Sequence, residues 1–306
     1  MEIDIIDTIV IYLLVNLIIF SYLGYGILSF KLLNLNYQNS NLGYIGISGC
    51  FLLILLSYIT IFFVPHNSIH NIIIIILGIL IFLKNYKSIN PKYLKLLLLF
   101  IIVTFSFFLI SKTHDDFPYY HFPYTNYLTK TDLIVGIGNY DPSWRSPSSI
   151  FYFNSLFFLP IIKFYLFHIG ALLIMGFSLI SIFIKGYKRF HLKKFDHIFF
   201  FQLLSFSFVL VFFYRLSEHG TDKSAQILSF LLILEILLLT IKEQDFETFS
   251  TNTFLIGSLA ISLKVFYLIF LVLLIPVIIF LYKEKKYFYF KQVIKNKLLY
   301  LCTFFF

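Results

Sequence analysis

The sequence predicts an all-α fold, a polytopic transmembrane helix bundle of about nine or ten spans. Of its 306 residues, 59% are hydrophobic and only 13% are charged, and the mean hydropathy is +0.89. This balance excludes an ordinary soluble domain. The hydrophobic residues also fall in long continuous runs. Because hydrocarbon offers no hydrogen-bond partners to the backbone, such runs must be helices.

Ten apolar runs predict the spans in chain order. Several are shorter than the roughly 20 residues that a span needs, which tilting or extension into the flanks accommodates. The first run has an acidic flank and is too long for a cleaved signal, so we expect it to remain as a span. The last stops after about two turns, so we expect a truncated span or a longer chain. The runs are 8–30, 43–64, 69–83, 96–110, 166–184, 197–214, 225–241, 254–263, 265–282 and 297 onward.

The distribution of lysines predicts the orientation. The connections 84–95, 185–196 and 283–297 are rich in Lys and Arg, which indicates the cytoplasmic side. The number of spans between them is consistent only if 149–163 does not cross, so we interpret that stretch as an interfacial or re-entrant helix. The N-terminus and the segments 112–148 and 215–224 are then outside.

These observations predict one transmembrane domain over residues 1–306. It comprises N-terminal spans in 1–95, an outer loop in 112–165 and C-terminal spans in 166–306. The predicted location is a bacterial inner (cytoplasmic) membrane, crossed several times with the N-terminus outside. The net charge of +9 is explained by the basic connections, so we expect membrane lipids and no nucleic acid as partners.

Candidate catalytic residues lie at the start of the outer loop. Asp115 and Asp116 are adjacent carboxylates just beyond a predicted span. Such carboxylates can act as bases, or can share a divalent cation with a phosphate. A divalent cation is possible but not required, and no metal ligand set is predicted. Tyr120 and His121 supply donors for phosphate or sugar hydroxyls. The alternative interpretation is a solvated loop whose acids only keep it outside.

Further along the loop, Trp144 and Arg145 are adjacent. They are candidates for stacking on a sugar and binding a phosphate, and the alternative is an interfacial anchor. The nearby Gly136 and Gly138 indicate turn chemistry rather than a nucleotide-binding loop, because no strand precedes them.

The second outer segment, 215–224, contains five ionisable residues in ten positions. A simple hairpin does not need so many, so His219, Asp222 and Lys223 are candidate substrate-binding residues. Lys264 lies between two apolar runs, where an unpaired ammonium is costly. It is a candidate phosphate ligand, and the alternative is a lysine that reaches the interface.

These residues resemble the GT-C superfamily of polytopic, lipid-sugar-dependent glycosyltransferases, and an uncharacterised bacterial membrane-protein group within it. The resemblance covers residues 112–282. It is carried by Asp116-x-x-x-Tyr120-His121-x-Pro123, the stretch 136–149 and the sequence 219–222. It implies a polyprenyl-phosphate-linked sugar as donor, a glycan or lipid as acceptor, and Asp116 as the base. Arg145, Lys223 or Lys264 would then offset the phosphate charge.

Two other functions remain open. One is a transporter or flippase for a lipid-linked glycan, for which Glu235, inside a predicted span, is the most favourable residue. We interpret Glu235 instead as a single neutral carboxyl that is hydrogen-bonded within the bundle. The other is a non-catalytic membrane protein of an envelope assembly, with the outer loops as its docking surface.

Overall fold

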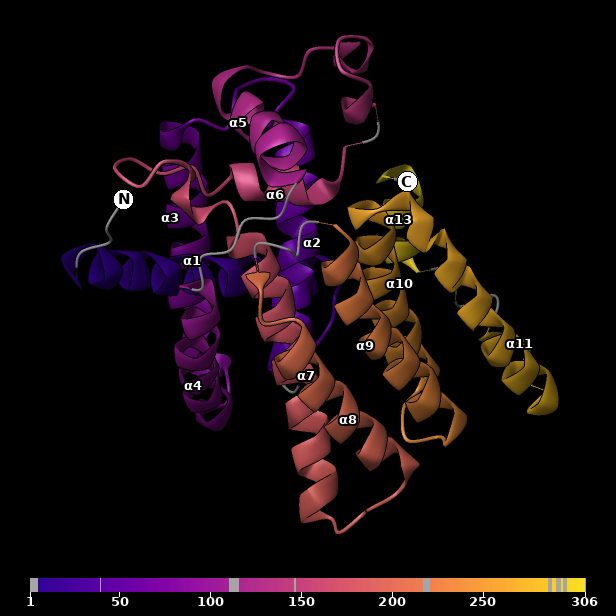
Figure 1. The fold of residues 1–306 in the computed structure, drawn as a ribbon. Helices are drawn as coiled ribbons and strands as arrows, with labels where there is room; N and C mark the ends of the chain where they lie inside the picture. Colours follow the sequence, from indigo (N-terminus) through magenta and orange to yellow (C-terminus); the bar gives the residue numbers. More distant parts are fainter. Residues whose placement is uncertain are drawn as a thin grey trace.

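A computed structural model describes residues 5–38, 40–109, 116–145, 147–216, 221–285, 288–289, 293 and 296–305. Throughout these residues the regular elements are helices, and the only β-pairing is an isolated bridge between Leu159 and Lys163. The protein is therefore an all-α bundle, as the composition predicts (Figure 1).

The longer helices follow the predicted runs closely. Six helical stretches in the described part of the chain are long and apolar enough to cross a membrane, and α8 is apolar but has only 16 residues. The six stretches are Thr8–Leu32, Leu42–Thr60, Ser68–Ser88, Phe164–His191, Asp222–Thr240 and Val265–Lys283. The helices are α1 (Ile5–Leu32), α2 (Leu42–Thr60), α3 (Ser68–Asn85), α4 (Pro91–Phe108), α5 (Phe122–Lys130), α6 (Ser149–Ser155), α7 (Ile169–His191), α8 (His197–Phe212), α9 (Asp222–Thr240), α10 (Phe246–Leu263), α11 (Leu274–Lys283) and α13 (Lys297–Phe305).

Helix α1 lies across α2 and α3 (Figure 1). Glycines permit this close crossing: a Cβ on Gly24 would lie 1.9 Å from the carbonyl oxygen of Gly78, and one on Gly26 would lie 2.0 Å from that of Ile45. Small residues at such contacts are typical of helices that pack by van der Waals contact within a membrane.

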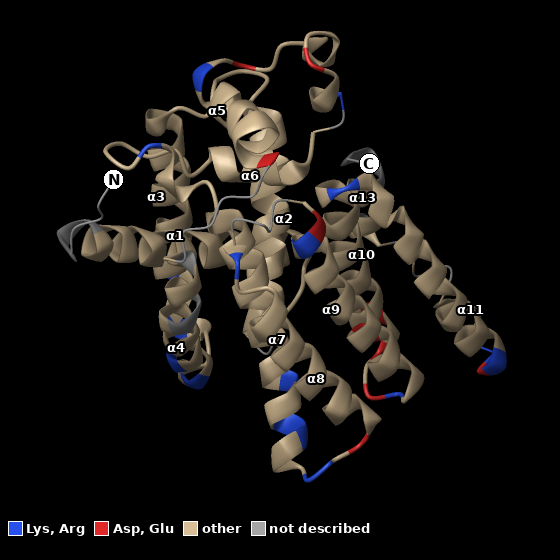
Figure 2. Ribbon diagram, in the orientation of Figure 1, with Lys and Arg blue, Asp and Glu red and all other residues tan. Residues whose placement is uncertain are grey.

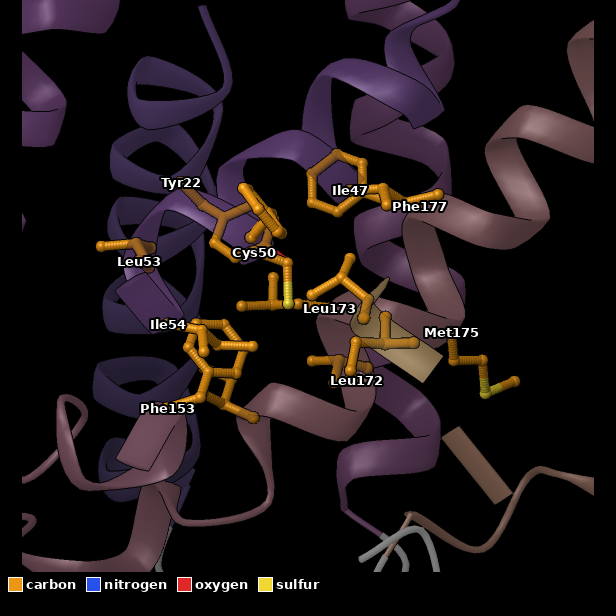
Figure 3. Packing of buried hydrophobic residues seen from close by; sticks show 14 of the residues in the cluster. Tyr22, Ile47, Cys50, Leu53, Ile54, Phe153, Leu172, Leu173, Met175 and Phe177 are labelled. Atoms are coloured by element: carbon orange, nitrogen blue, oxygen red, sulfur yellow. The ribbon is translucent and has the colours of Figure 1, made fainter. Parts of the chain in front are cut away.

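The core lies where α1, α2, α6 and α7 meet. The Tyr22 ring stacks on Phe177 with centroids 5.2 Å apart and contacts Phe153 at 5.8 Å. Figure 3 shows these rings with Cys50, which is buried among them. Cys50 is therefore a packing residue. Helices α2 and α7 form the centre of the bundle, and the polar residues lie towards its two ends.

The two ends of the bundle differ in charge (Figure 2). The connections α3–α4 and α7–α8, which are rich in Lys and Arg, lie at one end, which we call the basic end, together with the more acidic α9–α10 connection; α5 and α6 lie at the other end. Helix α7 continues to His191, so Lys185 and Arg189 lie on the helix rather than in the predicted connection 185–196. Cations in the last turns of a helix interact favourably with its C-terminal dipole.

Candidate functional site

A cavity of about 520 Å³ opens at the end of the bundle that carries α5 and α6. We call it the outer cavity, after the side on which the sequence analysis predicts this end to lie. It brings together residues from the two segments that the sequence analysis singled out, and from the junction that follows α10. The predicted site residues that line it are Asp116, Tyr120, His121, Asp222 and Lys264.

The first wall is a single turn of π-helix, η2 (Phe117–His121), that follows Asp116. The Tyr120 and His121 rings each lie 5.1 Å from the ring of Phe151, which is 1% exposed and belongs to α6. This buried ring fixes both side chains beside the exposed carboxylate of Asp116. Burial raises the pKa of Tyr120, so its hydroxyl remains a donor at neutral pH.

The opposite wall is an ion pair between two helix ends. Asp222 begins α9, and Lys264 is an extended residue between α10 and the 3₁₀ segment η7 (Val265–Leu273). Lys264 Nζ donates to Asp222 Oδ2 at 2.6 Å, and the Tyr267 hydroxyl donates to the other carboxylate oxygen at 3.3 Å. The two charged side chains are 46% and 44% exposed. The pair contributes little to stability and remains accessible from the cavity.

Hydroxyl groups connect the helices behind the cavity. The Tyr58 hydroxyl, on α2, donates to Ser149 Oγ at 2.7 Å, and Ser149 donates to the carbonyl oxygen of Ser262 on α10 at 2.6 Å. Tyr58, Ser148 and Ser262 line the cavity, and the sequence analysis missed them. Hydroxyl residues within or beside apolar runs carry no local signal that distinguishes a cavity wall from an ordinary packing position.

A buried histidine holds α6 in place. His66 Nδ1 lies 2.6 Å from Ser155 Oγ, and its Nε2 lies 3.1 Å from Thr60 Oγ1. The Ser155 hydroxyl donates to the carbonyl oxygen of Tyr152, so it accepts a hydrogen bond from Nδ1–H of a neutral imidazole. Burial lowers the pKa of His66 to about 3. The position of α6, and with it one side of the cavity, depends on this uncharged ring.

Trp144 and Arg145 do not line the outer cavity. The Trp144 ring packs against Tyr124 and Tyr127, with centroids 5.5 Å and 6.0 Å away. Arg145 Nε donates to the carbonyl oxygen of Gly138 at 3.2 Å. These contacts are all made with other residues of the outer loop.

The glycine pair forms a turn, as predicted. Gly136 has a φ of +89°, a conformation that favours glycine, and a short 3₁₀ turn, Ile137–Asn139, follows it.

The remaining predicted site residues are Lys223, Asp115 and His219. Lys223 follows Asp222 in α9 but is not part of the lining. Asp115 and His219 lie outside the described residues. Among the described residues, no group of three or more His, Cys, Asp or Glu side chains is arranged to hold a metal ion.

Glu235 differs from the lone neutral carboxyl that the sequence analysis expected. It is fully buried on α9 and forms an ion pair with Lys185 of α7. Tyr44 also donates to it, as do the amides of Gln244, at 2.5 Å, and Asn252, at 2.8 Å. The ion pair was missed because Lys185 was assigned to a connection, whereas α7 extends far enough to place it beside α9.

The fold and its outer cavity define an all-α membrane protein with a polar, charged site at one end of the bundle. The chain belongs to the family described as Domain of unknown function (DUF8201), whose model matches residues 8–306. Comparison with curated proteins and with solved structures finds no match to the chain.

Proposed function

We propose that the protein is a membrane glycosyltransferase that uses a polyprenyl-phosphate-linked sugar at the outer face of the inner membrane. The observation that supports this proposal is the meeting of Asp116 with the Asp222–Lys264 pair in one cavity. Asp116 lies more than a hundred positions before either member of this pair in the sequence. A carboxylate that can accept a proton, in the same cavity as a positively charged group, suits transfer from a phosphate leaving group.

Asp116 would act as the general base. Its carboxylate accepts the proton of an acceptor hydroxyl while that oxygen forms a bond to the anomeric carbon. The bond from the anomeric carbon to the phosphate oxygen breaks at the same time, and polyprenyl phosphate leaves with the electron pair. Because a single displacement occurs, the product has the inverted anomeric configuration.

Lys264 would bind the phosphate. An ammonium has three N–H donors, and one of them is used on Asp222. Tyr120 and His121 lie on the other wall, where the tyrosine hydroxyl and the imidazole nitrogens can hydrogen-bond to sugar hydroxyls. The volume of about 520 Å³ lies within the range of small-molecule sites.

The decisive variant is Asp116→Asn, which keeps the shape of the side chain and removes the base. We expect release of polyprenyl phosphate to fall about 10²- to 10⁴-fold. The measurement uses the purified chain in lipid nanodiscs with polyprenyl-phosphate glucose and polyprenyl-phosphate mannose as donors and membrane glycolipids as acceptors.

The matched control is Asp132→Asn. Asp132 is also an exposed aspartate of the outer loop, but it does not line the cavity. Turnover by this variant should equal that of the wild type. Equal turnover by an inserted Asp116→Asn variant, or a product of retained configuration, would exclude Asp116 as the base of a single displacement.

A further inference from the structure

A second cavity, of about 540 Å³, lies at the basic end of the bundle. We call it the inner cavity. Leu238, near the end of α9, belongs to its lining, whereas Asp222 at the start of α9 belongs to the outer cavity. Helix α9 has 19 residues, or about 28 Å at 1.5 Å per residue. The two cavities are therefore separate sites at opposite ends of one helix pair, α9 and α10.

The charges around the inner cavity balance. Arg189 forms ion pairs with both Asp196 and Glu243, and Lys194 pairs with Glu243 at 2.9 Å. The Lys185–Glu235 pair lies beside them. Lys188 and Asp245 also line the cavity, so four cations and four carboxylates lie in or beside it. The cavity therefore does not select an anionic ligand by charge.

The inner cavity contains buried amide groups without hydrogen-bond partners. Gln202 of α8 is 2% exposed, and neither its amide nitrogen nor its amide oxygen is hydrogen-bonded within the described chain. Gln244 donates to Glu235, but its oxygen has no partner there either. A buried polar group without a partner is costly. Both side chains line the cavity, so a ligand in it can satisfy them.

Amide and hydroxyl side chains make up nine of the nineteen residues that line the cavity. An amide offers a donor and an acceptor in fixed positions, and a sugar hydroxyl both donates and accepts. Uncharged hydroxyl-rich molecules therefore suit a wall of amides and hydroxyls, and the volume is that of a small-molecule site. The amide and hydroxyl side chains of the lining are Asn36, Ser40, Asn41, Tyr44, Gln202, Gln244, Thr248, Thr251 and Asn252.

We infer that the inner cavity is a binding site for an uncharged, hydroxyl-rich ligand, a sugar, which Gln202 and Gln244 hold through their free amide atoms. The sugar is either a free saccharide or the head group of a neutral glycolipid, because both present the same hydroxyls. This site uses none of the residues of the outer cavity, so it is independent of the proposed transfer reaction.

The test is Gln202→Met in the 306-residue chain in lipid nanodiscs. The probes are glucose, galactose, mannose, N-acetylglucosamine and monoglucosyl diacylglycerol, and binding is measured by calorimetry and by thermal unfolding. We expect the wild type to bind at least one of these probes and the variant to bind it at least about tenfold more weakly. Without ligand, the variant should unfold at the same temperature as the wild type or higher, because it no longer buries an unpartnered amide.

Gln38→Met is the matched control. Gln38 is exposed and is not part of the lining, so its replacement should leave binding unchanged. Asp116→Asn should also bind the sugar normally, which separates this test from that of the proposed function.

Each outcome bears on the inference. Binding of a free sugar identifies a saccharide site, and binding of the glycolipid alone identifies a head-group site. Absence of binding by every probe would overturn the sugar site, and equal affinity in Gln202→Met would show that the free amide of Gln202 does not hold the ligand. Tighter binding of glucose 1-phosphate than of glucose would contradict the inference that the ligand is uncharged.

Discussion

The outer and inner cavities lie at opposite ends of the same two helices but hold their charges differently. In the outer cavity, Asp222 and Lys264 are each nearly half exposed and form one ion pair. At the inner cavity, Glu235 is fully buried and has four hydrogen-bonding partners, which lie on α2, on α7, in the α9–α10 connection and on α10. A buried carboxylate needs such partners because the interior does not solvate its charge.

The difference indicates separate roles for the two sets of charges. The buried network joins α2, α7, α9 and α10, so its charges maintain the arrangement of the helices. The outer pair is anchored between two helix ends and remains open to solvent, so its charges are available to a ligand. Substitutions at the two ends should therefore affect stability to very different extents.

The largest loss of unfolding free energy is expected for Lys185→Met. Removal of the ammonium leaves Glu235 buried without its cationic partner, and breaking a buried pair in this way costs about 3–5 kcal/mol of unfolding free energy. Chemical unfolding in detergent micelles at neutral pH measures the loss. The control is Lys188→Met on the exposed side of α7, which should change stability by no more than about 0.5 kcal/mol.

The double variant Lys185→Met with Glu235→Met extends this comparison. Replacing both members of a buried pair by apolar residues is often neutral, so most of the lost stability should return. If Lys185→Met proves as stable as Lys188→Met, the buried network does not hold the helices together.

A smaller, pH-dependent effect is expected at the outer end. The pKa of His66 is about 3 in the folded chain, against about 6.5 for an unperturbed histidine. Between pH 6.5 and pH 3 the imidazole of His66 binds a proton in the unfolded chain but not in the folded chain. The unfolding free energy therefore decreases as the pH falls below 6.5. The slope is at most about 1.4 kcal/mol per pH unit.

His66→Gln should remove this dependence. The difference in unfolding free energy between pH 6.5 and pH 5 is compared for the wild type, for this variant and for His191→Gln, in which an exposed histidine is replaced. Only His66→Gln should have the flatter profile. An unchanged profile would mean that His66 is not kept neutral by burial.

The smallest effect on stability is expected for Asp222→Asn. Because the pair with Lys264 is half exposed, its loss should change the unfolding free energy by less than about 1 kcal/mol. The same unfolding assay measures it, with Lys185→Met as the reference. A loss as large as that of Lys185→Met would remove the distinction between the two ends.

Most of the fold could be predicted from the sequence because a bilayer leaves few choices. Long apolar runs must be helices, and their order follows from the chain. The polar segments around Asp116 and Asp222 could be recognised because charged residues contrast with the apolar sequence on either side. The turn at Gly136 could be recognised because its positive φ favours glycine, and this preference depends only on the local backbone.

The sequence by itself determined the class of the fold, the helical runs and the polar segments that supply the outer cavity. Only the tertiary structure decided which of those residues meet: Asp116, Asp222 and Lys264 share a cavity, while Trp144 and Arg145 pack within their own loop. It also revealed the Lys185–Glu235 pair and the unpartnered Gln202. Such contacts join residues on different helices, and their energies depend on burial and on partners that no local pattern encodes.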